Sequence, residues 1–288
     1  MTASDNHHPS HSHYENWEEQ LVALDVEGSL ARPWLASAAH WVVEGLDVQR
    51  VIDAGSGPAY ASVEFALRQP NAIVIAVDPT QPFLDRGSVV AAEAGVADRV
   101  ELVRGRIDDL GTLPAADIVW ASHVVHHTPD PGAAIAALAA STTPGGRVAI
   151  AEGGLPMRNL PGGYGVSDPG LMARLEAELS RYYRERWNMT DAALSGERDW
   201  PDRMRDAGLI DVESRTFVLD LTAPVSRVAR QHIVRHFEHV RDAVGTRLPE
   251  ADRVALDVLL DREDPRSLIR RADLFLLSAN TVHRGTRV

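Results

Sequence analysis

The chain has 288 residues, 44% hydrophobic and 24% charged, and its 41 acidic against 29 basic residues give a net charge of −12. It contains no cysteine, which excludes disulfides, cysteine–zinc sites and thiol nucleophiles. The acidic balance disfavours nucleic-acid binding, and no stretch approaches the roughly 20 apolar residues of a membrane span. We therefore expect a cytoplasmic globular protein, a monomer or homodimer, with neither nucleic-acid nor membrane partners.

The N-terminal residues form a polar tail followed by helical patterns. Residues 1–13 show no apolar periodicity and are predicted to be disordered. The tail has four histidines in no recognised metal motif, so we expect no functional metal site there: His7, His8, His11 and His13. Helical spacing then occurs twice within 15–45, on either side of Pro33, which predicts two helices.

Residues 50–152 alternate short apolar runs with helical patterns, which is typical of βαβ units and a parallel sheet. Five strands are predicted, over 51–54, 72–77, 100–103, 117–121 and 147–151. Three helices are predicted between them, over 59–69, 81–94 and 131–141. This segment is therefore expected to form an α/β core.

The C-terminal half is mainly helical. Apolar stripes predict helices over 168–187, from Trp200, over 223–245 and over 249–261. Strand-like patterns over 212–221 and 273–282 predict two late strands. Because no internal repeat and no Pro/Gly/Ser-rich linker is visible, we expect one domain with helical insertions.

A glycine turn between a buried strand and a helix is the most informative motif. Gly55 and Gly57 allow a tight turn and let a ligand contact the backbone, and the following helix N-terminus offers free N–H groups. Asp78 ends the next strand, where an acidic side chain can accept both ribose hydroxyls of an adenosine.

Two further residues indicate which nucleoside this turn binds. Asp53 would repel a pyrophosphate but attract a ligand with a cationic sulfonium and an amino group. Tyr60 stands where a dinucleotide fingerprint requires its third glycine. The pattern therefore favours a sulfonium nucleoside over NAD.

These residues resemble the class I S-adenosylmethionine-dependent methyltransferases. The resemblance is strongest to the small-molecule branch that includes the ubiquinone and menaquinone C-methyltransferases and actinobacterial natural-product enzymes. It is specific over about 50–152. The segments similar to family motifs are 51–57 (the first motif), 77–79 (the acidic ribose loop), 105–110 (the adenine segment), 121–131 (the motif after the fourth strand) and 144–147 (the entry to the fifth strand).

The resemblance implies a Rossmann-like, seven-stranded, mostly parallel α/β sheet with an antiparallel last strand, N-terminal helices and a helical cap around strand 6. It implies one methyltransferase domain over 14–288, with a cofactor-binding core at 50–152 and a cap at 168–208 and 223–262. The implied activity is methyl transfer from S-adenosylmethionine to O, N or C of a small metabolite, as in secondary metabolism. We hypothesise that the cap helices form a lid that sets substrate choice.

The resemblance also implies a set of cofactor contacts. They are Asp53, Gly55, Ser56, Gly57, Asp78, Pro79, Ile107, Asp108 and Ser122. Asp53 would orient the methionine amino group, directly or through water, and Asp78 would bind the ribose. Arg106 stands where many relatives have an acidic residue, so Asp108 is expected to contact the adenine amine, with Asp109 as the alternative.

Methyl transfer requires little of catalytic side chains, because the sulfonium is already activated and positioning supplies most of the acceleration. A general base is needed only for an acceptor that arrives protonated. His123, at the end of the fourth strand, either is that base or simply lines the pocket. Glu152, at the end of the fifth strand, could contact substrate, and His126 and His127 are interpreted as structural.

Three histidines share one face of the helix predicted over 223–245: His232, His236 and His239. Without a fourth ligand we expect no metal there, and such a face is more often solvated or part of a cavity roof. Two other functions are considered. One is a protein that binds S-adenosylmethionine without methylating, and the other, disfavoured by Asp53 and Tyr60, is an NAD(P)-dependent oxidoreductase.

Overall fold

The computed structural model describes residues 17–162, 165–167, 169–186 and 200–288. The tail predicted over 1–13 lies outside the described residues. No described helix is both long enough and apolar enough to cross a membrane.

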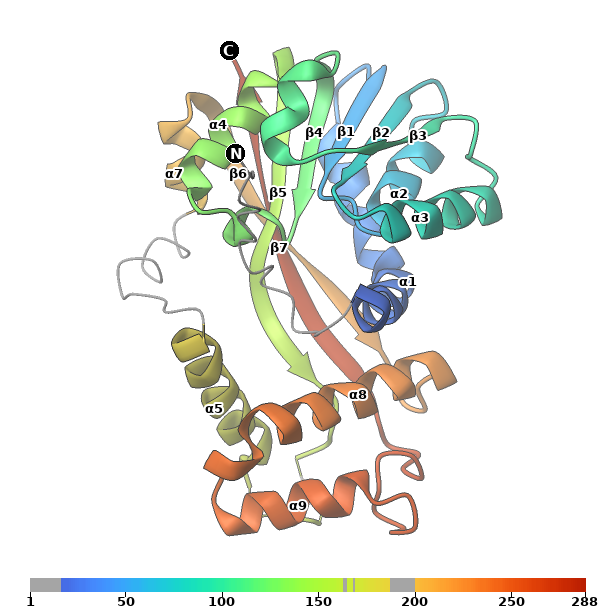
Figure 1. Cartoon of the computed structure of the whole chain (residues 1–288), viewed down its shortest axis with the longest axis vertical. Helices are drawn as coiled ribbons and strands as arrows, with labels where there is room; N and C mark the ends of the chain where they lie inside the picture. The colour runs from blue at the N-terminus through green and yellow to red at the C-terminus, as the bar shows by residue number, and fades with distance from the viewer. Residues whose placement is uncertain (1–16, 163–164, 168, 187–199) are drawn as a thin grey trace, which may run out of the picture.

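A seven-stranded sheet organises the molecule, in the order β3-β2-β1-β4-β5-β7-β6 (Figure 1). The strands are β1 Arg50–Ala54, β2 Ile73–Asp78, β3 Val100–Arg104, β4 Ala116–Ser122, β5 Thr142–Arg158, β6 Leu209–Leu221 and β7 Leu276–Arg287. Strand β7 is antiparallel to both of its neighbours, and the pairs among β1 to β5 are parallel. The predicted mostly parallel sheet with an antiparallel last strand is confirmed.

Helices cover both faces of this sheet because its strands are apolar on both sides. In β1, Val51 packs in a cluster with residues of α1, α2 and α3, whereas its neighbour Ile52 packs with residues of α4 and α7. Successive strand residues point to opposite faces, so a continuous apolar run produces two cores. The helices on the first face are α1 Trp17–Val43, α2 Tyr60–Arg68 and α3 Gln81–Glu93, and those on the second are α4 Pro131–Ala140 and α7 Trp200–Asp206.

The prediction of two N-terminal helices separated at Pro33 is wrong, because α1 runs unbroken with Pro33 inside it. An interior proline costs about 3 kcal/mol through a lost backbone hydrogen bond and a steric clash. Helix α1 is buried before the proline at Ala23 and after it at Trp34 and Leu35. Packing on both sides of the proline therefore offsets its cost.

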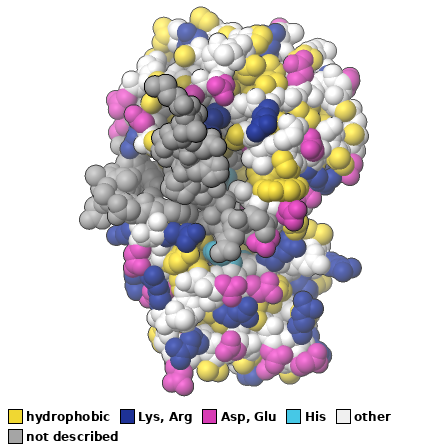
Figure 2. All heavy atoms as spheres, in the orientation of Figure 1, with side chains coloured by type: hydrophobic (Ala, Val, Ile, Leu, Met, Phe, Trp, Pro, Cys, Tyr) yellow, Lys and Arg dark blue, Asp and Glu magenta, His cyan; other side chains and the backbone are white. Residues whose placement is uncertain are grey.

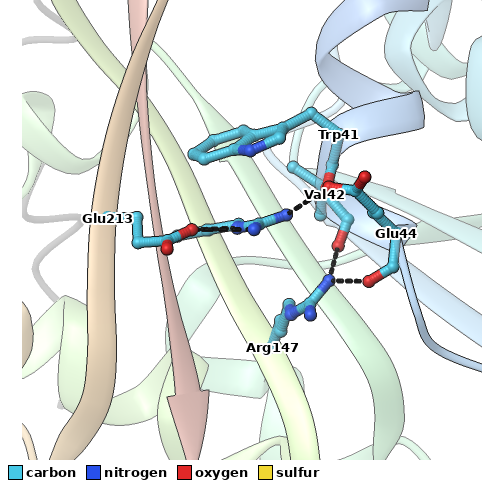
Figure 3. A network of polar contacts seen from close by, with 6 residues as sticks. Trp41, Val42, Glu44, Arg147 and Glu213 are labelled. Atoms are coloured by element: carbon cyan, nitrogen blue, oxygen red, sulfur yellow. Dashed lines mark hydrogen bonds and ion pairs between the residues drawn. The ribbon is translucent and has the colours of Figure 1, made fainter.

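The C-terminal end of α1 is tied to the sheet by two arginines (Figure 3). Arg147 of β5 donates to the carbonyl oxygens of Val42 and Glu44, each at 2.7 Å. Arg284 of β7 donates to the carbonyl of Trp41, and its guanidinium lies 4.2 Å from the centre of the Trp41 ring. These cations satisfy carbonyls that a helix end leaves unpaired.

Strands β5, β6 and β7 extend beyond the other strands and carry a helical cap (Figure 1). The cap helices are α5 Leu171–Arg186, α8 Arg227–Val244 and α9 Glu250–Leu260. The buried stripe of α8 joins the same hydrophobic cluster as α1 and one face of the sheet. The carboxyl ends of the parallel strands therefore face the space between the sheet and the cap.

Candidate cofactor and active site

The glycine turn follows β1 and is bound to the end of β2. Gly55 and Gly57 have φ of +73° and +51°, a left-handed conformation that favours glycine. A Cβ on Gly55 would lie 2.4 Å from the Val124 side chain, whereas a Cβ on Gly57 would meet no atom within 4 Å. The N–H groups of Gly55 and Ser56 donate to the carbonyl of Val77 at 2.8 and 3.0 Å. Backbone at Gly57 is thus left open for close approach by a ligand.

Asp78 connects the two predicted cofactor loops, which are the glycine turn after β1 (residues 55–57) and the acidic loop after β2 (residues 77–79). It ends β2 at 7% exposure, and its carboxylate accepts hydrogen bonds from the N–H of Gly57 at 3.0 Å and of Thr80 at 2.8 Å. Burial raises the pKa of Asp78, against the opposing effect of these hydrogen bonds. A carboxylate has about four acceptor positions, and the Thr80 side chain also interacts with this one, so acceptor capacity remains for ribose hydroxyls. The structure therefore fits an adenosine at this position, with the exposed Pro79 beside it.

Asp53 is placed differently from what a direct ligand contact would need. It is 2% exposed, and its carboxyl accepts a hydrogen bond of 2.5 Å from the Ser62 hydroxyl on α2. Burial raises its pKa to about 7, and the hydrogen bonds of Ser62 counteract part of that rise. At this exposure the Asp53 carboxyl offers little surface for direct contact with a ligand.

The predicted adenine segment forms the short 3-10 helix η1 Ile107–Thr112, next to the end of β2. The N–H of Gly105 donates to the carbonyl of Asp78 at 3.2 Å, which holds the two segments together. Asp109 accepts a hydrogen bond from the N–H of Arg106 at 2.8 Å and so caps η1, whereas no described residue binds the exposed Asp108 carboxylate. Ile107 is buried at 9% exposure. The geometry favours Asp108 over Asp109 for a ligand contact.

A second group of polar residues lies just after β4 and, on β5, just after Ala151, the last residue that pairs with β4. Ser122 ends β4, and His123 follows with φ of +53°, its Nε2 3.1 Å from the side-chain oxygen of Asn280 on β7. Desolvation lowers the pKa of His123, although its ring remains accessible to solvent. A neutral imidazole can accept a proton, so the structure is compatible with the general-base role. The ring lines a cavity of about 430 Å³ together with Trp200 and Asn280.

Glu152 and His126 form a pair in this cavity that the sequence reasoning missed. Glu152 is 2% exposed, and one carboxylate oxygen accepts hydrogen bonds from the N–H groups of Val124 and Val125 at 3.2 and 2.9 Å. The other oxygen lies 2.7 Å from Nδ1 of His126. Burial alone would raise the pKa of Glu152, but His126, His123 and the Val125 N–H together lower it. The available signal was the parallel pairing of β4 with β5, which places Glu152 beside the residues that follow β4.

The three histidines of α8 lie in the cap, apart from these groups. His239 is 2.5 Å from the Tyr183 hydroxyl of α5, and burial lowers the pKa of His236 to about 4. Within the described part of the chain, no three histidine or acidic side chains are placed to hold a metal ion. Figure 2 shows histidine side chains in cyan at the level between the sheet and the cap helices.

Comparisons with known proteins match the part of the chain that carries both cofactor loops. Residues 52–150 match the family model described as a methyltransferase domain. A stretch of 133 residues is 33% identical to the ubiquinone biosynthesis O-methyltransferase of Bordetella avium, covering 46% of this chain and 52% of that protein. Another of 112 residues is 32% identical to an uncharacterized methyltransferase of Schizosaccharomyces pombe, covering 37% of this chain and 40% of that one.

A solved structure supports the same fold. A candidate methyltransferase of Bacillus halodurans C-125 superposes with a TM-score of 0.50 at 15% identity, over 88% of this chain and 98% of that one. This chain spans between about a quarter and about half of the length of the curated relatives it matches.

Proposed function

We propose that this chain is a class I S-adenosylmethionine-dependent methyltransferase, because residues 52–150 match a methyltransferase domain and the curated relatives include methyltransferases. In this proposal the protein binds S-adenosylmethionine and methylates O, N or C of a small metabolite. The observation that carries this proposal is the hydrogen bond between Gly57 and Asp78. It joins a ligand-accessible glycine turn to a carboxylate with free acceptor positions, at the carboxyl edge of the sheet where open α/β folds bind ligands.

Each predicted cofactor residue has a role in this proposal. Asp78 accepts the ribose hydroxyls, the backbone from Gly55 through Ser56 to Gly57 lines the methionine arm, and Asp53 acts through water. Beside the ribose, Pro79, Ile107 and Ser122 supply contact surface, and Asp108 accepts the adenine amine. These residues orient the donor toward the cavity that contains His123.

When bound, S-adenosylmethionine supplies a methyl group that is already activated on a sulfonium. The chain then has to position an acceptor and, where the acceptor is protonated, remove a proton. His123 is proposed to take that proton on its ring, which the lowered pKa keeps neutral at pH 7. A cavity of about 430 Å³ is within the size range of small-molecule sites, which supports a small metabolite as the acceptor.

The test is calorimetric titration of the full chain with S-adenosylmethionine, S-adenosylhomocysteine and NADH, using the wild type and Asp78→Ala. Loss of two hydrogen bonds to a charged group removes roughly 3 kcal/mol, so we expect the variant to bind both adenosyl ligands at least about a hundredfold more weakly. Asp85→Asn, an acidic residue of α3, is the control and should bind as the wild type does.

Other outcomes would change the proposal. Binding of NADH alone would overturn it in favour of an oxidoreductase. Binding of the adenosyl ligands without methylation of a panel of phenols, amines and carbon acids would favour the non-methylating alternative.

A further inference from the structure

The methionine arm of the proposed cofactor carries a positively charged amino group, for which an ionised carboxylate is a favourable partner. Asp53 lies under α2 at 2% exposure, and its carboxyl is bound by Ser62. The following inference rests on the proposed function, because it concerns how the same cofactor is held.

Helix α1 packs against the start of α2 and is ion-paired to α3, the two helices that follow the cofactor loops. Tyr60, three residues after Gly57, lies directly against Gly28, where an added Cβ would be 2.1 Å from the tyrosine ring. The Tyr60 hydroxyl donates to Asp25 at 2.8 Å, and Arg86 of α3 donates to the same carboxylate at 2.6 Å. Figure 1 shows this N-terminal part of α1 between the sheet and helix α8.

Glu27 belongs to the inward-facing stripe of this helix. At 100° per residue, positions 27, 34 and 38 point in nearly the same direction. Trp34 and Ala38 are buried at 5% and 0% exposure, and so is Ala23 on the N-terminal side, whereas Glu27, two turns before Trp34, is exposed. Glu27 therefore shares a stripe with buried residues of α1 and directly precedes Gly28, the residue that lies against Tyr60 after the glycine turn.

No described residue neutralises or hydrogen-bonds the Glu27 carboxyl. The surrounding protein raises its pKa to about 7 by desolvation, with no hydrogen bond or neighbouring charge to oppose the rise. Such a carboxyl gains more from a cationic ligand than one already paired. Asp25, two residues earlier in α1, is instead held by Arg86 and Tyr60.

We propose that Glu27 binds the positively charged amino group of the cofactor's methionine arm. Three features support this assignment. Helix α1 packs against Tyr60 beside the glycine turn, Glu27 shares a stripe with buried residues of α1, and no described residue competes for its carboxyl. Asp78 holds the ribose at one end of the ligand, and Glu27 holds the charged group at the other.

The test separates the two ends of the ligand. S-adenosylhomocysteine carries the amino-acid arm, whereas 5′-methylthioadenosine has the same adenosine without it. At pH 8, where Glu27 is ionised, Glu27→Gln should bind S-adenosylhomocysteine at least about tenfold more weakly, which is the loss of one charge-assisted hydrogen bond. Its affinity for 5′-methylthioadenosine should equal that of the wild type. Asp78→Ala should weaken both ligands, and Glu18→Gln, on the first turn of α1, neither.

Two results would overturn the assignment. Equal losses for both ligands would mean that Glu27→Gln disturbs the whole site, and unchanged affinity for both would mean that Glu27 contacts neither. Thermal unfolding of Glu27→Gln verifies that its fold is intact. Failure of the wild type to bind either ligand would refute the proposed function and this assignment with it, whereas wild-type binding with an unaffected variant refutes the assignment alone.

Discussion

At the scale of a single residue, the buried Asp53 carboxyl links the end of β1, just before the glycine turn, to helix α2. Its carboxyl accepts the Ser62 hydroxyl at 2.5 Å, while burial raises its pKa from 3.8 to about 7. Because the pKa of Asp53 is higher in the folded state, protonation of this carboxyl favours folding. With respect to this group, the free energy of unfolding is therefore highest below about pH 4 and falls as pH rises from about 4 to about 7. Above pH 7, therefore, the folded protein holds an ionised carboxylate at a cost.

We predict that Asp53→Asn is more stable than the wild type at pH 8. The amide oxygen still accepts the Ser62 hydroxyl, but no buried charge has to form. The rise of the Asp53 pKa from 3.8 to about 7 sets an upper bound of about 4 kcal/mol on this gain in stability, and we expect about 1–2 kcal/mol. Urea denaturation between pH 4 and 8 measures this difference, which should grow up to pH 7 and then level off. A difference that is constant with pH would contradict the explanation.

Some site residues can be predicted from sequence because their role depends on nearby positions. Gly55 and Gly57 are required by the turn itself, and Asp78 lies one strand–helix–strand step from Asp53. The pairing of Glu152 with His126 depends instead on how β4 and β5 align, which local patterns do not fix. The enclosure of Asp53 by Ser62, likewise, is visible only once α2 has packed on β1.

At the scale of elements, the predicted bounds of β1 to β4 agree with the structure to within one residue at each end, whereas the predicted length of β5 is wrong. Strand β5 was predicted over 147–151 but covers Thr142–Arg158. Its extension pairs with β7, more than a hundred residues later in the chain, with irregular register between Ala151 and Gly154. The same reason explains α1: its continuity through Pro33 comes from packing on distant elements, against the local signal to stop.

The irregularity in β5 requires a specific glycine, which makes the long strand testable. Gly154 has φ of +134°, and a Cβ there would lie 1.9 Å from the carbonyl oxygen of Ala279 on β7. Gly153 has φ of +77°, and a Cβ there would meet no atom within 4 Å. The two neighbours therefore share a positive φ but differ in steric contact.

We predict that Gly154→Ala destabilises the protein markedly more than Gly153→Ala. An alanine at positive φ costs about 1–2 kcal/mol, and overpacking against β7 adds about 1–3 kcal/mol at Gly154 alone. The free energy of unfolding in urea measures both variants. Equal losses would mean that β5 and β7 are not in the close contact described here.

At the scale of the whole molecule, the cap and the sheet are joined by a common core. Residues Ile233, Phe237 and Val240 of α8 are at most 1% exposed and belong to the hydrophobic cluster that includes α1 and the strand residue Val51. Helix α1 contacts both α2 beside the glycine turn and α8 in the cap. We therefore propose that the described residues unfold as one cooperative unit, as expected for a single domain, even though the cap is connected to the rest of the sheet through the three long strands β5, β6 and β7.

We predict a single calorimetric unfolding transition whose Tm changes both with substitutions in the cap and with ligand binding at the sheet. Phe237→Ala removes a fully buried ring from the cap and should cost about 3–5 kcal/mol, lowering the Tm of the entire transition. Val228→Ala, on the same helix but 41% exposed, should change it little. S-adenosylhomocysteine, bound at the carboxyl edge of the sheet, should raise the Tm of that same transition by mass action. Two transitions, one moved only by Phe237→Ala and the other only by the ligand, would instead mean that the cap unfolds independently. In that case α1 would not transmit stability between the cap and the cofactor loops.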